Sequence, residues 1–131
     1  MRYLLDVNAL VALGLQKHEF HERVVRWTQT GFPELATCSI SELGFVRIIA
    51  QTSQYGFSVS SPRELLLRLK AATLVKFSFL NDDHDISQLP VWVKTARQVT
   101  DGHLLRLAKA NGAILATLDR GIPGALLIPA H

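Results

Sequence analysis

The chain has 131 residues, of which 48% are hydrophobic and 19% charged, with 14 Lys and Arg against 11 Asp and Glu. This composition is typical of a globular protein and excludes a disordered tail, and a chain of this length needs neither disulfides nor a structural metal to fold. We expect a single domain over residues 1–131, and its net charge of +3 suits a polyanionic partner.

The first half of the chain alternates short apolar runs with residues at helical spacing. Asn8 is placed to cap the first of the predicted helices. In chain order we expect a strand at Tyr3–Leu5, helices at Ala9–Leu15 and His18–Thr30, a strand at Leu35–Cys38, a buried helix at Ser39–Gln51 and a loop at Thr52–Ser61.

The second half continues the same alternation, and Asn111-Gly112 marks the end of its last helix. We expect a helix from Pro62 to about Ala72, an extended segment at Leu74–Phe79, a loop at Asn81–Pro90, a helix at Asp101–Asn111, and strands at Ala113–Leu118 and Ala125–Ile128. Strands that alternate with helices predict an α/β fold with a mainly parallel central sheet.

Four acidic residues follow or adjoin the predicted strands. Asp6 ends the first strand, Glu42 lies in the first turn of the helix after the second, Asp101 opens a helix, and Asp119 follows the strand that ends at Leu118. In open α/β sheets, ligands bind outside the carboxyl ends of the strands, and three of the four acids lie just beyond such an end. These acids are therefore candidates for one shared site.

Each acid also has an ordinary structural explanation. Asp6 can cap the following helix, Ser39 to Glu42 has the pattern of a capping box, Asp101 is a common acid for a helix start, and Asp119-Arg120-Gly121 fits a turn. For any one acid taken alone, a cap or a turn is the commoner explanation.

Taken together, the four acids indicate a metal site. Clustered carboxylates repel one another by roughly 4 kcal/mol per pair at about 4 Å with an effective dielectric constant of about 20. Such a cluster persists only with a cation, and oxygen ligands without Cys or His favour Mg²⁺ or Mn²⁺. The chemistry that follows is hydrolysis of a phosphodiester, in which one or two metal ions activate water.

Four motifs, in this order and spacing, carry a resemblance to a known family. They are Leu4-Leu5-Asp6-Val7-Asn8, Ser41-Glu42-Leu43-Gly44-Phe45-Val46-Arg47, Val99-Thr100-Asp101-Gly102-His103-Leu104-Leu105 and Leu115-Ala116-Thr117-Leu118-Asp119-Arg120-Gly121. Over nearly its whole length the chain resembles PIN-domain ribonucleases, specifically the VapC toxins of bacterial type II toxin–antitoxin modules.

The resemblance implies a PIN-like α/β/α domain that acts as a metal-dependent endoribonuclease. Asn8 and Thr117 correspond to polar residues that support the acids through hydrogen bonds. The partners implied are an RNA substrate and a cognate antitoxin protein, and we also expect a homodimer. The residues that would bind Mg²⁺ or Mn²⁺ and carry catalysis are Asp6, Glu42, Asp101 and Asp119.

Several cations are candidates for contacts with RNA phosphates. Arg47 interrupts a largely apolar helix, so its charge must reach a carboxylate or the solvent. A structural ion pair and a phosphate contact explain Arg47 equally well. Arg120 is a second candidate, and Arg97, Arg106 and Lys109 are further cations whose direction the sequence leaves open.

Other polar clusters have simpler explanations. His18 and His21 stand three residues apart, but no third ligand has suitable spacing, so we interpret them as helix-surface residues. The acidic run Asp82-Asp83-His84-Asp85 predicts a solvated loop rather than a cation site. His103 is expected to be a surface neighbour of the acidic site rather than a general base.

Apolar residues on the two N-terminal helices raise the question of a docking surface. Leu13, Leu15, Phe20 and Trp27 either form an exposed groove for an amphipathic antitoxin segment or complete the core or a homodimer interface. In the first case a basic side chain of the antitoxin would compete with the metal among the four acids.

Other function classes fit this sequence less well than a ribonuclease does. A receiver domain would carry an acidic pair after the first strand and a Lys after the last, whereas this chain has Leu5-Asp6 and no Lys after Lys109. A phosphatase with an Asp-x-Asp nucleophile is disfavoured because the third position is Asn8. A PIN-domain nuclease of RNA processing without a toxin role stays open, and the four acids argue against a silent RNA-binding domain.

The sequence also predicts a cytoplasmic protein without membrane association. The single cysteine, Cys38, cannot form an internal disulfide, which is typical of a reducing compartment. No apolar run reaches the roughly 18 residues of a membrane span, and Asp6 and Asn8 interrupt the N-terminal stretch that superficially resembles a signal peptide.

Overall fold

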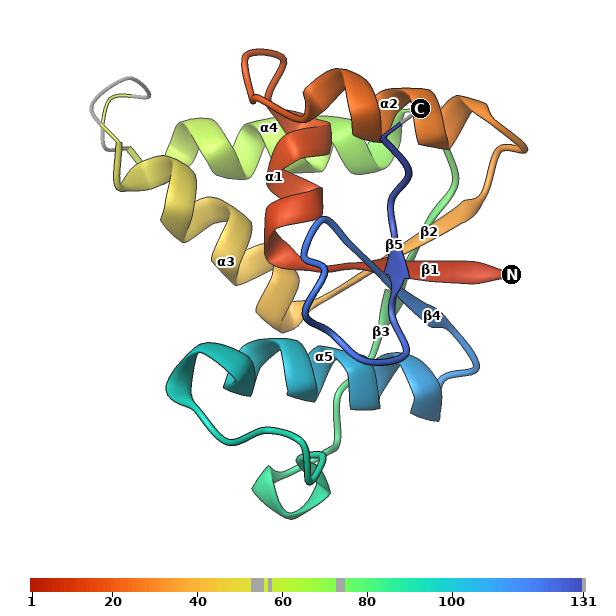
Figure 1. Cartoon of the computed structure of the whole chain (residues 1–131). Coiled ribbons are helices and arrows are strands. Elements are labelled where there is room, and N and C mark those ends of the chain that lie inside the picture. Colours follow the sequence, from red (N-terminus) through yellow and green to blue (C-terminus); the bar gives the residue numbers. More distant parts are fainter. Residues whose placement is uncertain (53–55, 57, 73–74, 131) are drawn as a thin grey trace.

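A computed structural model describes residues 1–52, 56, 58–72 and 75–130. Its centre is a five-stranded sheet in the order β3-β2-β1-β4-β5, in which all paired neighbours are parallel. Figure 1 shows this sheet between two layers of helices, which confirms the predicted α/β/α class. The strands are β1 (Arg2–Leu5), β2 (Glu34–Cys38), β3 (Phe77–Leu80), β4 (Ile114–Thr117) and β5 (Leu126–Leu127).

Four helices cover one face of the sheet and one helix covers the other (Figure 1). The four are α1 (Val7–Gly14), α2 (His21–Gln29), α3 (Ser39–Ala50) and α4 (Ser60–Ala71), and the fifth is α5 (Val99–Ala110). Two short 3₁₀ helices, η2 (Ile86–Gln88) and η3 (Ala96–Gln98), precede α5. Because successive strand residues point to opposite faces, Leu5 packs under α1 whereas Leu4 packs under α5.

The order of the strands reverses beside β1. The chain builds outward from β1 through β2 to β3, then returns to the other side of β1 for β4 and β5. The carboxyl ends of β1 and β4 are therefore neighbours: Leu5 is paired with Ala116, and the Asp6 amide donates to the Ala116 carbonyl at 3.1 Å. This reversal is where open α/β sheets bind their ligands.

Several helices begin elsewhere than the sequence predicts. Asn8 was expected to cap α1, but the cap is Asp6, whose Oδ1 accepts a hydrogen bond from the Ala9 amide at 2.8 Å. The helix expected from His18 begins only at His21, while α5 begins at Val99, before Asp101. The spacing of apolar residues predicts which face of a helix is buried more reliably than it predicts where the helix begins, because the first turn depends on capping contacts.

Three further predictions concern two loops and the third strand. The loop expected at Thr52–Ser61 ends earlier, since α4 begins at Ser60, and residues 53–55 and 57 lie outside the described residues. The extended segment predicted at Leu74–Phe79 corresponds to β3, which runs from Phe77 to Leu80, and Leu74 lies outside the described residues. The loop expected at Asn81–Pro90 contains the 3₁₀ helix η2.

The apolar residues of the N-terminal helices complete the core. Leu13 is only 7% exposed, and Leu15, Phe20 and Trp27 pack against the buried cluster under α1. These residues therefore follow the core alternative, while Trp27 stays half-buried and lines two small surface pockets. An exposed apolar surface lies instead between α3, α4 and β3, where Leu43, Val59, Leu67 and Phe79 line a groove of about 380 Å³.

The two N-terminal histidines make local structural contacts, as predicted. Nδ1 of His21 lies 2.8 Å from the Ala12 carbonyl oxygen, and Nδ1 of His18 accepts a hydrogen bond from the Phe20 amide at 3.0 Å. Cys38 is a buried free thiol. Among the residues that the model describes, no helix is long and apolar enough to cross a membrane.

Candidate active site

The site is organised around Asp6, which is 3% exposed at the carboxyl end of β1. One carboxylate oxygen caps α1 through the Ala9 amide, and the other accepts a hydrogen bond from the Thr117 hydroxyl at 2.5 Å. Asp6 therefore does cap α1, as its structural explanation predicted. The same contacts fix the side chain at the point where β1 and β4 lie side by side.

Thr117 connects Asp6 to Asp119. Its hydroxyl donates to Asp6 Oδ2 and accepts a hydrogen bond from the Asp119 amide at 2.9 Å. Asp119 Oδ1 in turn accepts from the Gly121 amide at 2.7 Å, which is the turn that its sequence predicts. The 1% exposed Thr117 thus sets the positions of two acids that are 113 residues apart in the chain.

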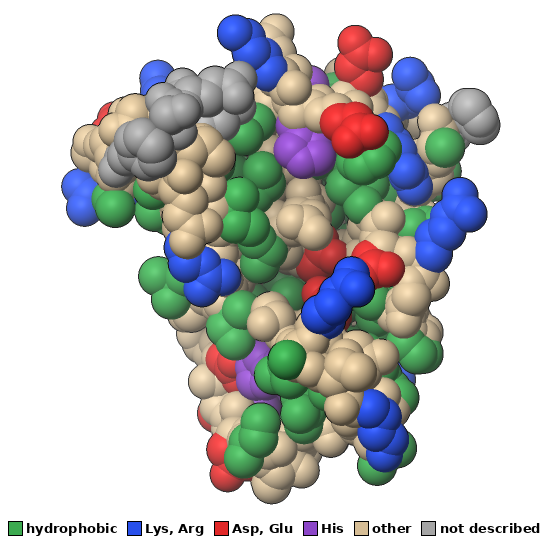
Figure 2. Space-filling view, turned by 60° about the vertical axis from the view of Figure 1, so that its left-hand side comes forward, with side chains coloured by type: hydrophobic (Ala, Val, Ile, Leu, Met, Phe, Trp, Pro, Cys, Tyr) green, Lys and Arg blue, Asp and Glu red, His purple; other side chains and the backbone are tan. Residues whose placement is uncertain are grey.

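Asp101 reaches the same place from α5. It lies in the first turn of that helix and is half-buried. Asp101 and Asp119 both line a cavity of about 210 Å³, whose wall also contains Trp92, Arg97 and Gln98. Figure 2 shows acidic side chains in a hollow at the middle of one face of the molecule, with a cationic side chain lying across them.

The pKa values of these acids reflect their shared position. Burial is the main cause that raises the pKa of Asp6 from 3.8 to about 6, and repulsion from Asp101 and Asp119 adds to it, against the hydrogen bonds from Thr117 and Ala9. Burial, and then repulsion from Asp119, also raises the pKa of Asp101. Asp101 and Asp119 therefore lie close enough to Asp6 for their charges to act on it.

Glu42 is turned to other partners. Its Oε2 accepts a hydrogen bond from the Thr37 hydroxyl at 2.5 Å and forms an ion pair with Lys70 Nζ of α4 at 2.5 Å. The capping box suggested for Ser39 to Glu42 is not formed, because the residue before α3 is Cys38 and Ser41 makes the local contacts there. Glu42 lines the apolar groove beside Leu43, not the cavity of Asp101 and Asp119.

The donor chemistry of the three converging acids fits a hard divalent cation. Their carboxylates supply oxygen ligands, two of them have raised pKa values, and a cavity opens beside Asp101 and Asp119. Across residues 1–52, 56, 58–72 and 75–130, no three His, Cys, Asp or Glu side chains are arranged so that they could hold a metal ion. The three acids therefore have the charge and the donor atoms that such an ion requires, but their side chains are not arranged around a single point.

The remaining predicted site residues take varied positions. Asn8 is exposed and, within the described part of the chain, makes no side-chain hydrogen bond. Arg47 is exposed and forms no ion pair with any described carboxylate, so it reaches the solvent. Arg120 is exposed next to Asp119, and Arg97 is the arginine that lines the acidic cavity.

Three residues of this region were not singled out by the sequence. Lys70 and Thr37 hold Glu42, and Trp92 forms part of the cavity wall. Lys70 is 28 residues from Glu42 on another helix, and Trp92 lies in a segment without periodicity, so no local pattern indicates either. Gly102 did belong to a motif: a Cβ there would overlap Val93, which explains why this position needs glycine.

Comparison with known proteins identifies the family and the fold. The model of the PIN domain family matches residues 3–124. Among relatives from Mycobacterium tuberculosis, the chain is 39% identical to "Ribonuclease VapC38" over 91% of this chain and 86% of the relative. It is 37% identical to "Ribonuclease VapC39", with 93% and 91% covered.

A solved structure has the same fold. The Mycobacterium tuberculosis protein VapC20, described as a sarcin-ricin loop cleaving toxin, superposes with a TM-score of 0.68 over 96% of this chain and 98% of that chain, at 11% identity. That likeness concerns the fold, and the sequence matches supply the family. The chain therefore belongs to the PIN-domain family, among its VapC-type ribonucleases.

Proposed function

We propose that this chain is a divalent-metal-dependent endoribonuclease that cleaves RNA phosphodiester bonds and acts as the toxin of a toxin–antitoxin module. The observation that carries the proposal is the convergence of Asp6, Asp101 and Asp119 at the strand reversal of a parallel sheet. The names of the related ribonucleases support RNA as the substrate. We take residues 1–131 as one nuclease domain, slightly longer than the matched region.

Asp6, Asp101 and Asp119 would hold Mg²⁺ or Mn²⁺, and we propose Glu42 as the fourth acid. Such an ion would lower the pKa of water, so that hydroxide is available at neutral pH to attack a phosphodiester. The chain's own contribution is positional: Thr117 orients Asp6 and Asp119, and burial keeps bulk water away from Asp6. Arg97, at the cavity wall, is placed to contact the phosphate being cleaved.

The family match argues against the receiver-domain alternative, because the PIN domain model covers residues 3–124 of this chain. A PIN-domain nuclease without a toxin role would share the site described here, so only the partner separates it from a toxin.

We propose an antitoxin protein as that partner, and a homodimer as the assembled form. The apolar groove of Leu43, Val59, Leu67 and Phe79 supports the antitoxin, since it offers exposed apolar surface that the N-terminal helices do not. Glu42 lines the same groove, so a segment bound there would reach one of the proposed acids.

The function is tested by incubating the purified chain with single-stranded RNA in Mg²⁺ or Mn²⁺. We expect cleavage that EDTA abolishes and that added metal restores, because clustered carboxylates cannot organise a phosphodiester without a cation. Asp119→Asn is the control for contaminating nuclease. It changes only the acidic site of this chain, so a contaminant would cleave RNA equally in both preparations. Cleavage that persists in EDTA and is absent from Asp119→Asn would exclude the metal mechanism.

Asp6→Asn should abolish cleavage and stabilise the metal-free protein at neutral pH. The folded-state pKa of Asp6 lies above its unfolded value of 3.8, so stability is highest at low pH and is lost as pH rises from about 4 to about 6. The loss above pH 7 is on the order of 3 kcal/mol, and Asn removes it while still capping α1. Thermal midpoints from pH 4 to pH 8 measure the difference.

The matched control for this comparison is Glu64→Gln, because Glu64 is exposed and forms no ion pair with a described residue. It should leave cleavage and the pH dependence of the midpoint unchanged. A lower midpoint of Asp6→Asn than of the wild type at pH 7 would contradict this prediction. It would show that the hydrogen bonds to the ionised carboxylate stabilise the fold by more than the burial of its charge costs.

Glu42→Gln and Lys70→Gln together decide the role of Glu42. If Glu42 is the fourth acid, Glu42→Gln lowers the cleavage rate about tenfold or more, whereas Lys70→Gln, which leaves the carboxylate in place, does not. If Glu42 only pairs with Lys70, both variants lower the thermal midpoint and neither changes cleavage of the folded protein. Rates and midpoints of the two variants are measured side by side.

A further inference from the structure

Trp92 separates two hollows on the surface. It lies between η2 and η3 and forms part of the wall of the 210 Å³ cavity that contains Asp101 and Asp119. It also lines a second groove of about 420 Å³, between the segment 87–92 and the side of α5 that carries Arg106 and Lys109. The indole is half-buried, with one side packed on the core under α5.

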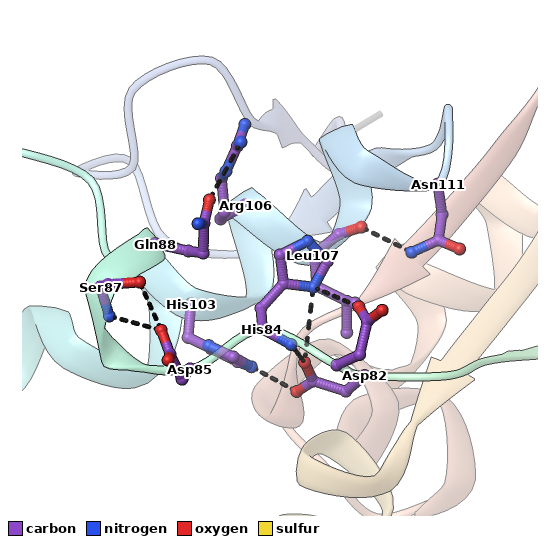
Figure 3. Close-up of polar contacts among 10 residues, drawn as sticks. Asp82, His84, Asp85, Ser87, Gln88, His103, Arg106, Leu107 and Asn111 are labelled. Carbon is purple, nitrogen blue, oxygen red and sulfur yellow. Dashed lines mark hydrogen bonds and ion pairs between the residues drawn. The ribbon is translucent and has the colours of Figure 1, made fainter.

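The segment that carries Trp92 is fixed to α5 by several contacts, two of which Figure 3 shows. Asp82 pairs with His103, and Arg106 donates a hydrogen bond to Gln88 Oε1 at 3.3 Å. Between these contacts Gly102 lets Val93 approach the helix more closely than any other residue would allow. The position of the indole is therefore set before any ligand arrives.

The charges beside Trp92 are positive and are not neutralised by a described carboxylate. Arg97 lines the acidic cavity, while Arg106 and Lys109 are exposed three residues apart on α5 and line the second groove. Within the described part of the chain, none of these three cations forms an ion pair. No acidic residue lines the second groove, which is therefore complementary to a polyanion.

A planar aromatic ring flanked by cations is the combination that binds single-stranded nucleic acid. Bases stack on the aromatic face regardless of sequence, and cations contact the phosphates. The apolar groove of Leu43 and Phe79 differs, because its lining is mainly aliphatic and the charges of its Glu42 and Arg63 offset each other. A polyanion is thus directed to the Trp92 side of the molecule.

We propose that Trp92 is a stacking platform for an unpaired base of single-stranded RNA. The phosphates of that strand contact Arg97 on the side of the acids and Arg106 and Lys109 in the second groove. The inference rests on the proposed ribonuclease function and adds the path of the strand across the surface. Because a paired base cannot stack on the indole, the path selects single strands over duplexes.

The test measures the fluorescence of Trp92 in a protein that cannot cleave. The chain has two tryptophans, and Trp27 packs in the core edge-on against Tyr3, so Trp27→Phe leaves Trp92 as the only indole. In this background, with Asp6→Asn and EDTA present, a 12-nucleotide single-stranded RNA should quench Trp92. The same sequence as a duplex should quench it much less at equal phosphate concentration.

Two sets of variants separate stacking from charge. Trp92→Leu should weaken single-strand binding about tenfold and Trp92→Phe much less, because stacking needs a ring. Arg106→Gln with Lys109→Gln should reduce the slope of log affinity against log salt by about 1.4, or about 0.7 for each lost phosphate contact. Lys17→Gln with Arg68→Gln, which removes two exposed charges that line neither hollow, should leave the slope unchanged.

The inference and the proposed function fail in different ways. If single-stranded RNA quenches Trp92 but the wild-type chain cleaves no RNA in Mg²⁺ or Mn²⁺, the result supports the Trp92 path and contradicts the nuclease. Metal-dependent cleavage with no quenching, and with unchanged affinity in folded Trp92→Leu, overturns the path alone. Equal quenching by a 12-residue polyglutamate would assign the groove to an acidic peptide and also overturn it.

Discussion

A buried carboxylate at the junction of β1 and β4 is the constraint on which the rest of the site depends. Asp6 caps α1, accepts a hydrogen bond from Thr117 and senses the charges of Asp101 and Asp119, so one side chain links a helix, two strands and α5. Water would stabilise its charge better than this environment does, as the raised pKa records. The fold therefore keeps an energetically unfavourable charge at the carboxyl ends of the strands, which is where open α/β sheets bind their ligands.

This constraint explains the neighbouring structure. Thr117 must be small, hydroxylated and buried to reach both Asp6 and the Asp119 amide, and Gly102 must lack a side chain for the Trp92 segment to lie against α5 beside Asp101. In the proposed function the structural contacts of these acids also serve the site. The cap at Asp6 and the turn at Asp119 fix the positions of the two carboxylates at the ends of β1 and β4.

The fold follows from the sequence because it depends on local pattern. Alternating strands and helices predicted the parallel sheet, and the acids after β1 and β4 were placed by topology alone. Glu42 shows where this reasoning ends, because its position depends on Lys70 of another helix. Trp92 was not predicted either, because its segment is fixed by contacts to α5 that no periodicity encodes. For the apolar residues near α1 and α2, the pattern alone could not distinguish a place in the core from a place in an exposed groove.

The central claim, that Asp6 carries a charge kept unfavourable by burial and by its acidic neighbours, is tested most directly by carboxyl-carbon NMR. The side-chain resonance of Asp6 is followed from pH 3 to pH 8 in metal-free protein and again in saturating Mg²⁺. We predict a midpoint near 6 without metal that falls below the ordinary aspartate value of 3.8 when Mg²⁺ is present. A midpoint at or below 3.8 in the metal-free protein, unmoved by Mg²⁺, would contradict the account.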